Sequence, residues 1–287
     1  AYHLRASVRV ATGFGGDPTR QLLSFRPDIV HVHNLFPNFG TRWLKDWRGP
    51  VVTTMHNFRA ICSNGLLFRN MSTCFDCTEG NPFPGIRHGC YRHSIPATVP
   101  VALSISRKGR VNPILERSDR VLCLSEASAE IFAGTGIARR RLTVIPNPLQ
   151  DPQPELQREG EGWLYSGRLT EEKGVMSLVR EWPRQAERLD VIGQGPLLDQ
   201  VKKECPANVR LIGPLERGEL LRRIPGYRGI LVPSACMEVQ PTVVTEALSC
   251  GIPVVAAAQN AAASTVNTLG VGATYSEARP LLDALNL

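Results

Sequence analysis

The segment from Glu238 to Glu246 combines two carboxylates with the start of a helix. Glu238 precedes Pro241, and Glu246 follows it among apolar residues. Proline suits the first position of a helix, so we expect Glu238 in a loop and Glu246 about one and a half turns into the helix. A carboxylate on a largely apolar helix needs a partner, either an arginine or the hydroxyl groups of a ribose or sugar. The N–H groups of Thr242 and Val243 would point from the helix start toward an anion.

Two cations follow another apolar run in the segment Gly167-Arg168-Leu169-Thr170-Glu171-Glu172-Lys173-Gly174. Arg168 and Lys173 stand between an expected strand end and an expected helix start. Cations beside a helix N-terminus can bind an anion, because the free N–H groups and the helix dipole add to their charge. Solvated surface cations are the alternative. Gly193 and Gly195 would let a ligand approach the backbone, although a lone G-x-G is weak evidence for nucleotide binding.

Four of the eight cysteines are clustered in a segment rich in glycine, proline and asparagine. The spacing Cys62-x11-Cys74-x2-Cys77-x12-Cys90 suits tetrahedral zinc. The segment has too few apolar residues to fold by packing alone, so we expect a structural zinc, with His88 or His93 able to replace one ligand. Disulfides, free thiols and an iron–sulfur cluster are the alternatives. The other four cysteines are scattered and are expected in cores.

The elements that must position these residues alternate between apolar runs and amphipathic stretches, which is typical of an α/β protein with parallel sheets. A helix capped by Ser125 is expected after the third strand. In a doubly wound sheet, ligands bind at the carboxyl ends of the strands. We expect strands at 28–33, 50–55, 120–124, 142–145, 163–166, 189–192, 209–212, 229–232 and 252–256, and helices at 173–182, 196–204, 216–224 and 241–250.

A breaker-rich segment from Pro146 to Gly162 divides the chain. We therefore expect a first domain at 1–150, with a Cys-rich insertion at 58–95, and a second domain at 151–287. The first half holds 19 Lys and Arg against 9 Asp and Glu, and the second half 14 against 17. This asymmetry suggests phosphate-bearing ligands, an anionic membrane or nucleic acid as partners of the first half. An arginine bias is the alternative, because 28 of the 33 cations are Arg.

The ten residues after Glu246, Ala247-Leu248-Ser249-Cys250-Gly251-Ile252-Pro253-Val254-Val255-Ala256, extend the pattern of the two glutamates. The whole segment resembles the E-x7-E region of the family 4 retaining glycosyltransferases of GT-B fold. The resemblance covers about residues 20–260 and implies two Rossmann-like doubly wound domains facing across a cleft. Five further segments resemble family motifs: Arg26-Pro27-Asp28-Ile29-Val30-His31-Val32-His33-Asn34, Val144-Ile145-Pro146-Asn147-Pro148, Gly167-Arg168-Leu169 through Lys173-Gly174, Val191-Ile192-Gly193-Gln194-Gly195-Pro196 and Asn208-Val209-Arg210-Leu211-Ile212-Gly213.

The resemblance implies transfer of a hexose from a UDP- or GDP-sugar to a glycan or lipid-linked acceptor, without a metal in the transfer. Arg168 and Lys173 would neutralise the donor diphosphate, and Glu246 would hold the ribose. His56, facing the donor sugar across the cleft, and Glu238, holding the hydroxyl groups of that sugar, would be the catalytic pair. The remaining donor-binding residues would be Gly193, Gln240, Pro241, Thr242 and Val243. The cysteine cluster is similar to a loop in a subset of the family.

The family resemblance also implies a place for the protein: polysaccharide biosynthesis for the cell envelope, in the cytoplasm. We expect the stretch from Arg87 to Arg120 to touch an anionic membrane where a lipid-linked acceptor resides, because cations alternate there with apolar residues: Arg87, Arg92, Arg107, Lys108, Arg110, Arg117 and Arg120. A solvated helical face is the alternative. Nucleic acid is not an expected partner, because aromatic residues are only 6% of the chain.

Two departures from the family pattern bear on activity. About 27 residues precede the His-Val-His strand, so the first domain is expected to be incomplete and the chain N-terminally truncated or reduced. Pro241 replaces a glycine common in the family and removes one N–H donor. The rival functions are an inactive or fragmentary nucleotide-sugar-binding protein, a GT-B-like epimerase or phosphorylase, and a zinc-bearing module that binds nucleic acid.

Overall fold

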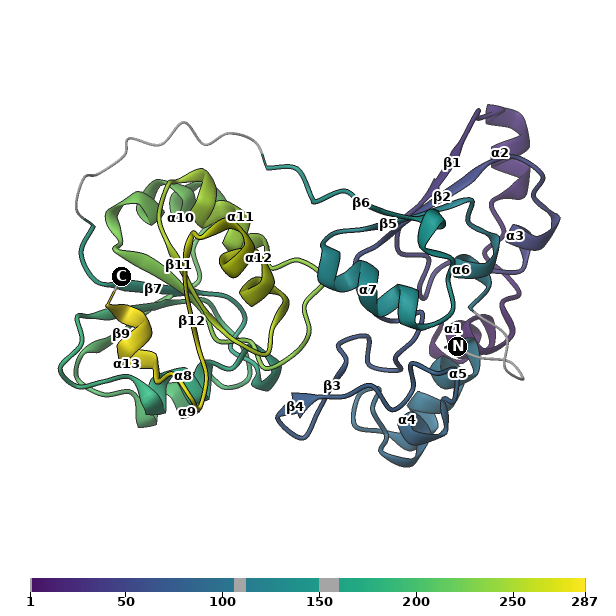
Figure 1. Cartoon of the computed structure of the whole chain (residues 1–287). Helices are drawn as coiled ribbons and strands as arrows, with labels where there is room; N and C mark the ends of the chain where they lie inside the picture. The colour runs from purple at the N-terminus through teal and green to yellow at the C-terminus, as the bar shows by residue number, and fades with distance from the viewer. Residues whose placement is uncertain (1, 106–111, 150–159, 287) are drawn as a thin grey trace. The chain divides into compact units, whose positions relative to one another are not determined.

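The computed structural model describes residues 2–105, 112–149 and 160–286, which form two compact units (Figure 1). The N-terminal unit comprises Ala1–Arg69 and Cys74–Pro146, and the C-terminal unit comprises Asn70–Thr73 and Asn147–Leu287. Arg107, Lys108 and Arg110, expected at a membrane, lie outside the described residues. No described helix combines the length and the apolar character that crossing a bilayer requires.

The N-terminal unit is built on a parallel sheet with the strand order β1-β2-β5-β6. Its strands lie where the apolar runs predicted them: β1 (Val30–Val32), β2 (Val51–Met55), β5 (Arg120–Cys123) and β6 (Leu142–Val144). Val30 pairs with Val51, and Val52 pairs with Arg120, so the carboxyl ends of β1 and β2 lie side by side. The two histidines that follow these strands, His33 and His56, are thereby brought to one edge of the sheet.

Two helices of the N-terminal unit contact that sheet, α6 (Pro113–Arg117) at β2 and α7 (Glu126–Gly134) at β5 and β6. As predicted, Ser125 caps α7, since its hydroxyl accepts from the Ser128 N–H at 3.2 Å. The first 27 residues, for which we predicted no element, contain α1 and α2, and α1 packs against α5. The helices are α1 (Tyr2–Thr12), α2 (Thr19–Phe25), α3 (Trp43–Asp46), α4 (Phe83–Arg87), α5 (Ile95–Ile105), α6 (Pro113–Arg117), α7 (Glu126–Gly134) and the 3-10 helix η1 (Arg139–Arg141), and the short strands β3 (Phe68–Arg69) and β4 (Ser72–Thr73) pair with each other.

The C-terminal unit contains a parallel sheet of six strands in the order β12-β11-β10-β7-β8-β9. β7 (Trp163–Ser166) lies between β10 (Gly229–Val232) and β8 (Leu189–Ile192). The strand order reverses around β7, which is the switch point where doubly wound sheets bind ligands. The outer strands are β9 (Val209–Gly213), β11 (Val254–Ala257) and β12 (Gly272–Tyr275).

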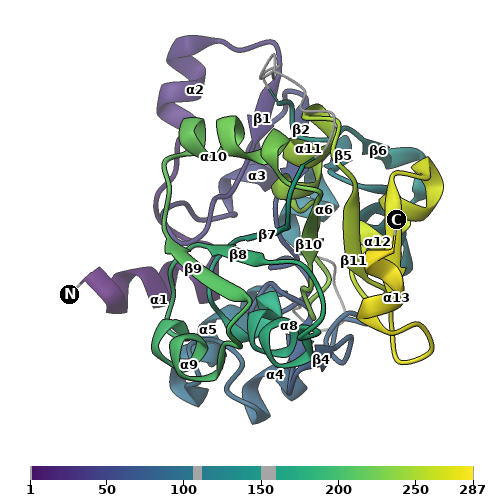
Figure 2. The same ribbon diagram turned by 90° about the vertical axis from the view of Figure 1, so that its left-hand side faces the viewer.

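Helices cover both faces of this sheet (Figure 2). One face packs on α8 (Val175–Glu181), α9 (Leu198–Glu204) and α13 (Leu281–Leu285) through a core that includes Trp163, Val179 and Leu189. The other face packs on α11 (Thr242–Ser249) and α12 (Ala261–Leu269), next to α10 (Arg217–Arg223). Two 3-10 helices complete the described elements, η2 (Glu171–Lys173) and η3 (Ile224–Gly226).

The prediction for this unit was incomplete at its C-terminal end. We expected five strands and four helices, and these are present within two residues of their expected bounds. The sequence analysis missed β12, α12 and α13. The run Gly272-Ala273-Thr274-Tyr275 has little apolar signal of its own, and it forms a strand because it pairs with the buried β11.

Candidate active site

Three loops meet at the carboxyl ends of β7, β8 and β10, all within the C-terminal unit. The Leu169 N–H donates to the Gln194 carbonyl oxygen at 3.0 Å, which joins the loop after β7 to the loop after β8. The Ala235 N–H donates to the Glu172 carbonyl oxygen at 3.0 Å, which joins the loop after β7 to the loop after β10. The predicted donor residues of the C-terminal unit therefore stand on or beside these connected loops, apart from Thr242, Val243 and Glu246, which lie on α11.

Two glycines are needed for these loops to pack. Gly174 has a φ of +68°, and a Cβ there would collide with the Pro233 carbonyl group. Gly193 has a φ of +145°, and a Cβ there would collide with the Gly167 carbonyl oxygen. We expected Gly193 to let a ligand approach the backbone, and the structure shows that the closely approaching group is another loop of the protein.

Lys173 and Glu238, predicted as separate ligand-binding groups, form an ion pair. The Lys173 Nζ atom lies 2.5 Å from Glu238 Oε2, and both side chains are largely buried. The Ser234 hydroxyl donates to Glu238 Oε1 at 2.5 Å. The carboxylate is thus held by a cation on one side and a hydroxyl on the other. Ser234 was missed because a serine after an apolar strand carries no signal of its own.

Arg168 differs from Lys173 in being held loosely. Its side chain is 65% exposed, and its Nη2 atom lies 3.1 Å from Oε1 of Glu172, whose side chain is 12% exposed. Water screens the Arg168 end of this pair, so a single contact holds the guanidinium weakly. The Arg168 guanidinium is therefore free to follow a ligand, whereas Lys173 is already committed to Glu238.

The start of α11 lies one residue later than predicted. Pro241 is the residue before the helix, and Thr242 is the first helical residue. Gln240, predicted to bind the donor, uses its side-chain amide inside the protein: Oε1 accepts from the Asn147 N–H at 2.7 Å, and Nε2 donates to Thr245 Oγ1 at 3.2 Å. These bonds fix the position of the loop that leads into α11.

Glu246 lies on α11 as predicted and is not a free surface acid. It is 6% exposed, and its Oε1 atom lies 3.4 Å from Arg217 Nε at the start of α10. Burial raises the pKa of Glu246, and the charge of Arg217 opposes this effect. An arginine partner is one of the two kinds of partner that the apolar helix predicted.

His56 lies at the end of β2 in the N-terminal unit and belongs to a group of three histidines. Its Nε2 atom lies 2.8 Å from His33 Nδ1, and the two rings stack with centroids 5.1 Å apart. His31 Nε2 lies 2.8 Å from Thr54 Oγ1. Burial and then the neighbouring His33 lower the pKa of His56, so its ring is neutral at pH 7. The sequence analysis singled out only His56.

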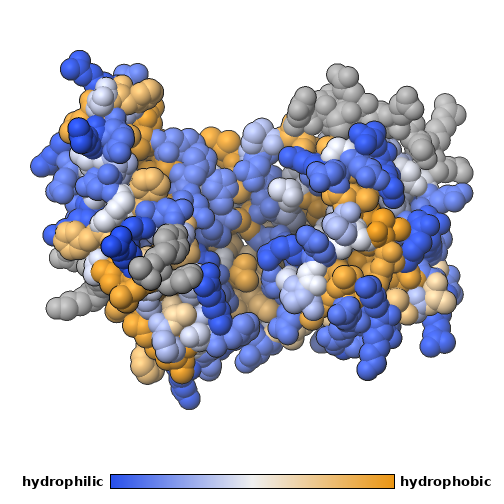
Figure 3. All heavy atoms as spheres, turned by 180° about the vertical axis from the view of Figure 1, so that it is seen from behind, coloured by the Kyte–Doolittle hydropathy of each residue, from blue (hydrophilic) through white to orange (hydrophobic). Residues whose placement is uncertain are grey.

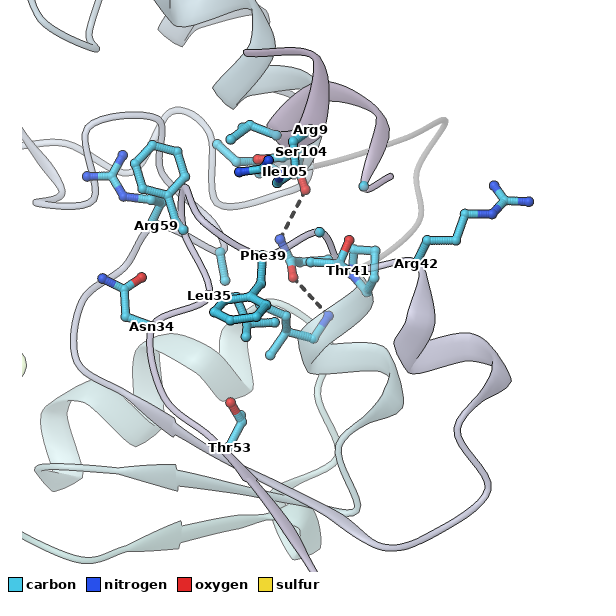
Figure 4. A pocket seen from close by; sticks show the side chains of 18 of the residues that line it. Arg9, Asn34, Leu35, Phe39, Thr41, Arg42, Thr53, Arg59, Ser104 and Ile105 are labelled. Carbon is cyan, nitrogen blue, oxygen red and sulfur yellow. Dashed lines mark hydrogen bonds between the residues drawn. The ribbon is translucent and has the colours of Figure 1, made fainter. Parts of the chain in front are cut away.

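A cavity of about 270 Å³ opens beside these histidines, and every residue that lines it belongs to the N-terminal unit (Figure 4). Its wall comes from the ends of α1 and α5, the segments after β1 and β2, and α6. The Ser104 carbonyl oxygen accepts from Asn112 Nδ2 at 3.0 Å, and the Asn112 Oδ1 atom accepts from the Ile114 N–H at 3.0 Å. Nothing in the sequence analysis predicted this cavity.

The clustered cysteines lie around a second, small cavity of about 10 Å³ in the N-terminal unit. All four are free thiols, which argues against the expected alternative of disulfides in this state. Burial raises the pKa of Cys77 to about 11. Within the described parts of the chain, no three His, Cys, Asp or Glu side chains are placed as a ready metal-binding set. The thiols share a cavity but do not converge on one point.

Comparisons with known proteins agree with this architecture. Residues 3–151 match the family described as Glycosyltransferase Family 4, and residues 161–285 match Glycosyl transferases group 1. No curated protein matched the chain.

Among solved structures, the chain is similar to the lipopolysaccharide outer core galactosyltransferase WaaB in its apo form (TM-score 0.57, 18% identity, 94% of this chain and 66% of that one). It is similar to Anabaena HepE in complex with UDP (TM-score 0.59, 17% identity, 93% and 70%). Sucrose-phosphate synthase from Thermosynechococcus elongatus is a third (TM-score 0.62, 17% identity, 93% and 65%). The chain therefore spans about two thirds of the length of these proteins, and these likenesses show the GT-B fold. With more than half of its residues matched by the family model, the chain belongs to Glycosyltransferase Family 4.

Proposed function

We propose that the protein is a retaining glycosyltransferase that moves a hexose from a nucleotide-diphosphate sugar to an acceptor hydroxyl group. The observation that carries this proposal is the Lys173–Glu238 ion pair, placed where three strand-end loops meet in the C-terminal unit. A cation that neutralises a diphosphate and a carboxylate that accepts from sugar hydroxyls are the two groups that a sugar donor requires. The family membership supports this reading of the pair.

In this proposal, Lys173 and Arg168 stabilise the negative charge that grows on the diphosphate as the glycosidic bond breaks. Lys173 must then share its charge between the diphosphate and Glu238. The guanidinium of Arg168, which is itself mostly exposed, can leave Glu172 and join it. Because two protein cations supply the charge, we propose that the transfer itself needs no divalent metal. Glu246 would accept hydrogen bonds from the ribose hydroxyls, as the family resemblance implies.

We propose a UDP- or GDP-hexose as donor and a glycan or lipid-linked acceptor of cell-envelope polysaccharide synthesis. Two of the similar structures are Anabaena HepE with UDP and with UDP and glucose, and this favours a uridine nucleotide as the first donor to test. An inactive nucleotide-sugar-binding protein, the second candidate function, would have the same donor site. Catalytic turnover therefore distinguishes a glycosyltransferase from such a binding protein.

Thermal unfolding with UDP, GDP, ADP and CMP tests the donor site on the wild type, Lys173→Ala and Lys202→Ala. Lys202 lies on α9, is 57% exposed and contacts Asp199 at 3.9 Å. Lys202→Ala is therefore the matched control, because it also removes one lysine, but away from the site. We expect one diphosphate to raise the Tm of the wild type and of Lys202→Ala but not of Lys173→Ala. A Tm that no nucleotide changes, or an equal shift in all three proteins, would contradict a donor site at Lys173.

We also propose a peripheral contact of the N-terminal unit with an anionic membrane at the cytoplasmic side. Apolar side chains are exposed on α4 and α5, including Phe83, Ile95 and Leu103, with Arg87 and Arg92 close in sequence. Figure 3 shows apolar surface at the lower edge of this unit, where α4 and α5 lie. Apolar residues beside cations favour binding to a bilayer interface.

Co-sedimentation with vesicles of phosphatidylglycerol and of phosphatidylcholine tests the membrane contact. We expect the wild type to bind only the anionic vesicles, and an Arg107/Lys108/Arg110→Ala variant to lose this binding. A Lys202/Lys203→Ala variant on α9 is the control for charge alone. Equal binding by the wild type and the triple variant would exclude this stretch as the contact.

Finally, we propose that the cysteine cluster holds a structural zinc. The donor set suits zinc: four free thiols line one cavity, and the buried Ser63 hydroxyl in its wall has no hydrogen-bond partner in the described structure. Gly85, also in that wall, leaves no room for a Cβ beside Ser63. Binding would draw the thiols together and release their protons.

Metal content of the purified protein tests the zinc site. We expect about one zinc per chain in the wild type and in Cys205→Ser, and a loss of zinc in Cys77→Ser. Cys205 is a free cysteine of the C-terminal unit outside the cluster. A wild type without zinc, or a Cys77→Ser variant that retains it, would exclude zinc at the cluster.

A further inference from the structure

The cavity of the N-terminal unit is lined by apolar side chains and by positively charged ones. Its volume of about 270 Å³ is near the lower end of the range for small-molecule sites, which is about 300–1,000 Å³. One part of its wall is apolar and is formed by Leu35, Phe36, Phe39, Leu103 and Ile105. Figure 4 shows Leu35 and Phe39 side by side in this wall, with Ile105 beside Ser104. The cavity can therefore cover a non-polar part of a ligand.

The charged groups of the wall are almost all positive. Arg9, Arg42, Lys45 and Arg59 line the cavity, against the single acid Glu116. The ion pairs found among the described residues include none of these four cations. A cavity with this excess of unpaired positive charge favours an anionic ligand.

The four cations differ in how far the protein already satisfies them. Arg59 donates to the Ser63 and Asn64 carbonyl oxygens at 3.1 and 3.3 Å, and its guanidinium lies 4.5 Å from the Phe36 ring centre, so it supports the wall. The Arg42 guanidinium lies 4.4 Å from the Phe14 ring centre and points away from the wall in Figure 4. Arg42 thus adds charge at the rim and makes no inward contact.

Arg9 and Lys45 are the cations left for a ligand. Arg9 Nη1 donates to the Pro37 carbonyl oxygen at 3.2 Å, while its Nε–H is buried without a hydrogen-bond partner in the described structure. The Nη2 group of Arg9 makes no hydrogen bond among the described residues, so it is the donor that Arg9 can offer to an anionic oxygen in the cavity. Lys45, on α3, is exposed, and its side chain makes no hydrogen bond or ion pair among the described residues, although its backbone N–H donates to the Arg42 carbonyl oxygen.

We propose that this cavity binds the acceptor by an anionic group, a carboxylate or a phosphate, held by Arg9 and Lys45. The apolar wall covers the non-polar part of the same molecule. The inference rests on the proposed function, because it takes the ligand of the N-terminal unit to be the acceptor of the transfer. It narrows the acceptor from any glycan or lipid-linked sugar to one that carries a negative charge close to an apolar surface.

Calorimetric titration with two matched ligand pairs tests the inference and distinguishes the two sources of charge. Glucuronic acid against glucose tests a carboxylate, and farnesyl phosphate against farnesol tests a phosphate on a lipid. We expect one anionic member to bind at least about tenfold more tightly than its neutral partner, since a hydrogen bond to a charged group is worth a tenfold change or more. Equal binding within both pairs would overturn the inference.

Variants locate the anion in the cavity. We expect Lys45→Gln and Arg9→Gln each to weaken binding of the preferred anion by about tenfold. Arg48→Gln is the control, because Arg48 is an exposed cation two residues beyond α3 that does not line the cavity. Full binding by Lys45→Gln, or an equal loss in Arg48→Gln, would contradict the assignment. Lys45 lies on the surface, so this arm remains informative if Arg9→Gln fails to fold.

UDP titration of the same proteins separates this inference from the proposed function. UDP binding without a preference for either anion would overturn the anionic acceptor and leave the donor site intact. Anion binding that depends on Lys45, in a protein that binds no nucleotide diphosphate, would support the anionic cavity and overturn the proposed donor site.

Discussion

At the scale of single residues, the proposed glycosyl transfer depends on Glu238 and its two partners. Lys173 and Ser234 hold the Glu238 carboxylate at 2.5 Å each, so its position and its orientation are both fixed in the unliganded protein. A preorganised group of this kind stabilises a transition state without having to reorganise. The sequence marked Glu238 and Lys173 as separate candidates for donor binding, but it could not predict their contact, because 65 positions separate them.

The Glu238→Gln variant tests this arrangement. We expect kcat/KM for the nucleotide-sugar donor to fall by about 100-fold or more, because the amide cannot hold Lys173 or accept in the same way. UDP binding should be retained or strengthened, since Lys173 is released to the diphosphate. Initial rates and UDP titration measure the two effects. Glu219→Gln, which removes an exposed ion pair to Arg223 on α10, should change neither quantity. Unchanged rates in Glu238→Gln would refute the role of the carboxylate.

The shifted pKa of Glu246 predicts whether the stability of the protein rises or falls with pH. Burial raises its pKa above the unfolded value, so the folded protein disfavours the charged form. The unliganded protein therefore loses stability as the pH rises through the folded pKa of Glu246, and the neutral Glu246→Gln variant avoids this loss.

We expect Glu246→Gln to be more stable than the wild type at pH 7.5, with a smaller difference at pH 5. Nucleotide binding should weaken in the same variant, because the ribose loses its carboxylate acceptor. Thermal unfolding at the two pH values and nucleotide titration provide the measurements. A variant that is less stable at pH 7.5 would show that the Arg217 contact outweighs the cost of burial.

At the scale of elements, a buried carboxylate holds the edge of the C-terminal sheet together. Asp190, on β8, is fully buried and accepts from Arg210 on β9 at 2.9 and 2.6 Å and from the Tyr227 hydroxyl at 2.8 Å. Burial alone would raise the pKa of Asp190, but the hydrogen bonds from Arg210 and Tyr227 outweigh it, so the pKa lies below its ordinary value.

Replacing Asp190 by Ala is expected to destabilise the protein by about 2–4 kcal/mol, because the buried Tyr227 hydroxyl loses its partner together with the ion pairs. The stability that Asp190 provides is present above its unfolded pKa and is lost as the pH falls through the lower folded pKa. Urea unfolding at pH 7 measures the effect. Asp199→Ala, at a side chain 98% exposed, is the control and should change stability by less than about 0.5 kcal/mol.

A strand could be predicted from the sequence when it forms an apolar run that is buried on both faces of the sheet. β7, β8 and β10 have this character and lie within one residue of their predicted bounds. α1 and α2 were not predicted, because among their described side chains only Ala6 of α1 is buried and α2 has no buried residue, so neither helix contains a run of buried apolar residues. The glycines between strands were recognised, but their purpose, loop packing at Gly174 and Gly193, depends on contacts that only the fold creates.

At the scale of the whole molecule, the uneven distribution of charge along the sequence corresponds to a cavity lined by cations in the N-terminal unit. The excess of Lys and Arg in residues 1–150 includes the cations around the cavity of the N-terminal unit. From this charge we predicted phosphate-bearing ligands among the possible partners of residues 1–150, but we did not predict where they would bind. The site could not be predicted, because Arg9, Lys45 and Glu116 come together only through the packing of α1, α3 and α6.

Release of UDP from UDP-glucose is the measurement that tests the central claim most directly. It would be followed with glucuronic acid or farnesyl phosphate as acceptor, on the wild type, Lys173→Ala and Lys202→Ala. We expect acceptor-dependent release of UDP by the wild type and by Lys202→Ala, and a loss of about 100-fold or more in Lys173→Ala. If a nucleotide binds at Lys173 but no UDP is released with any acceptor, the chain is a nucleotide-sugar-binding protein and the account of it as a glycosyltransferase is wrong.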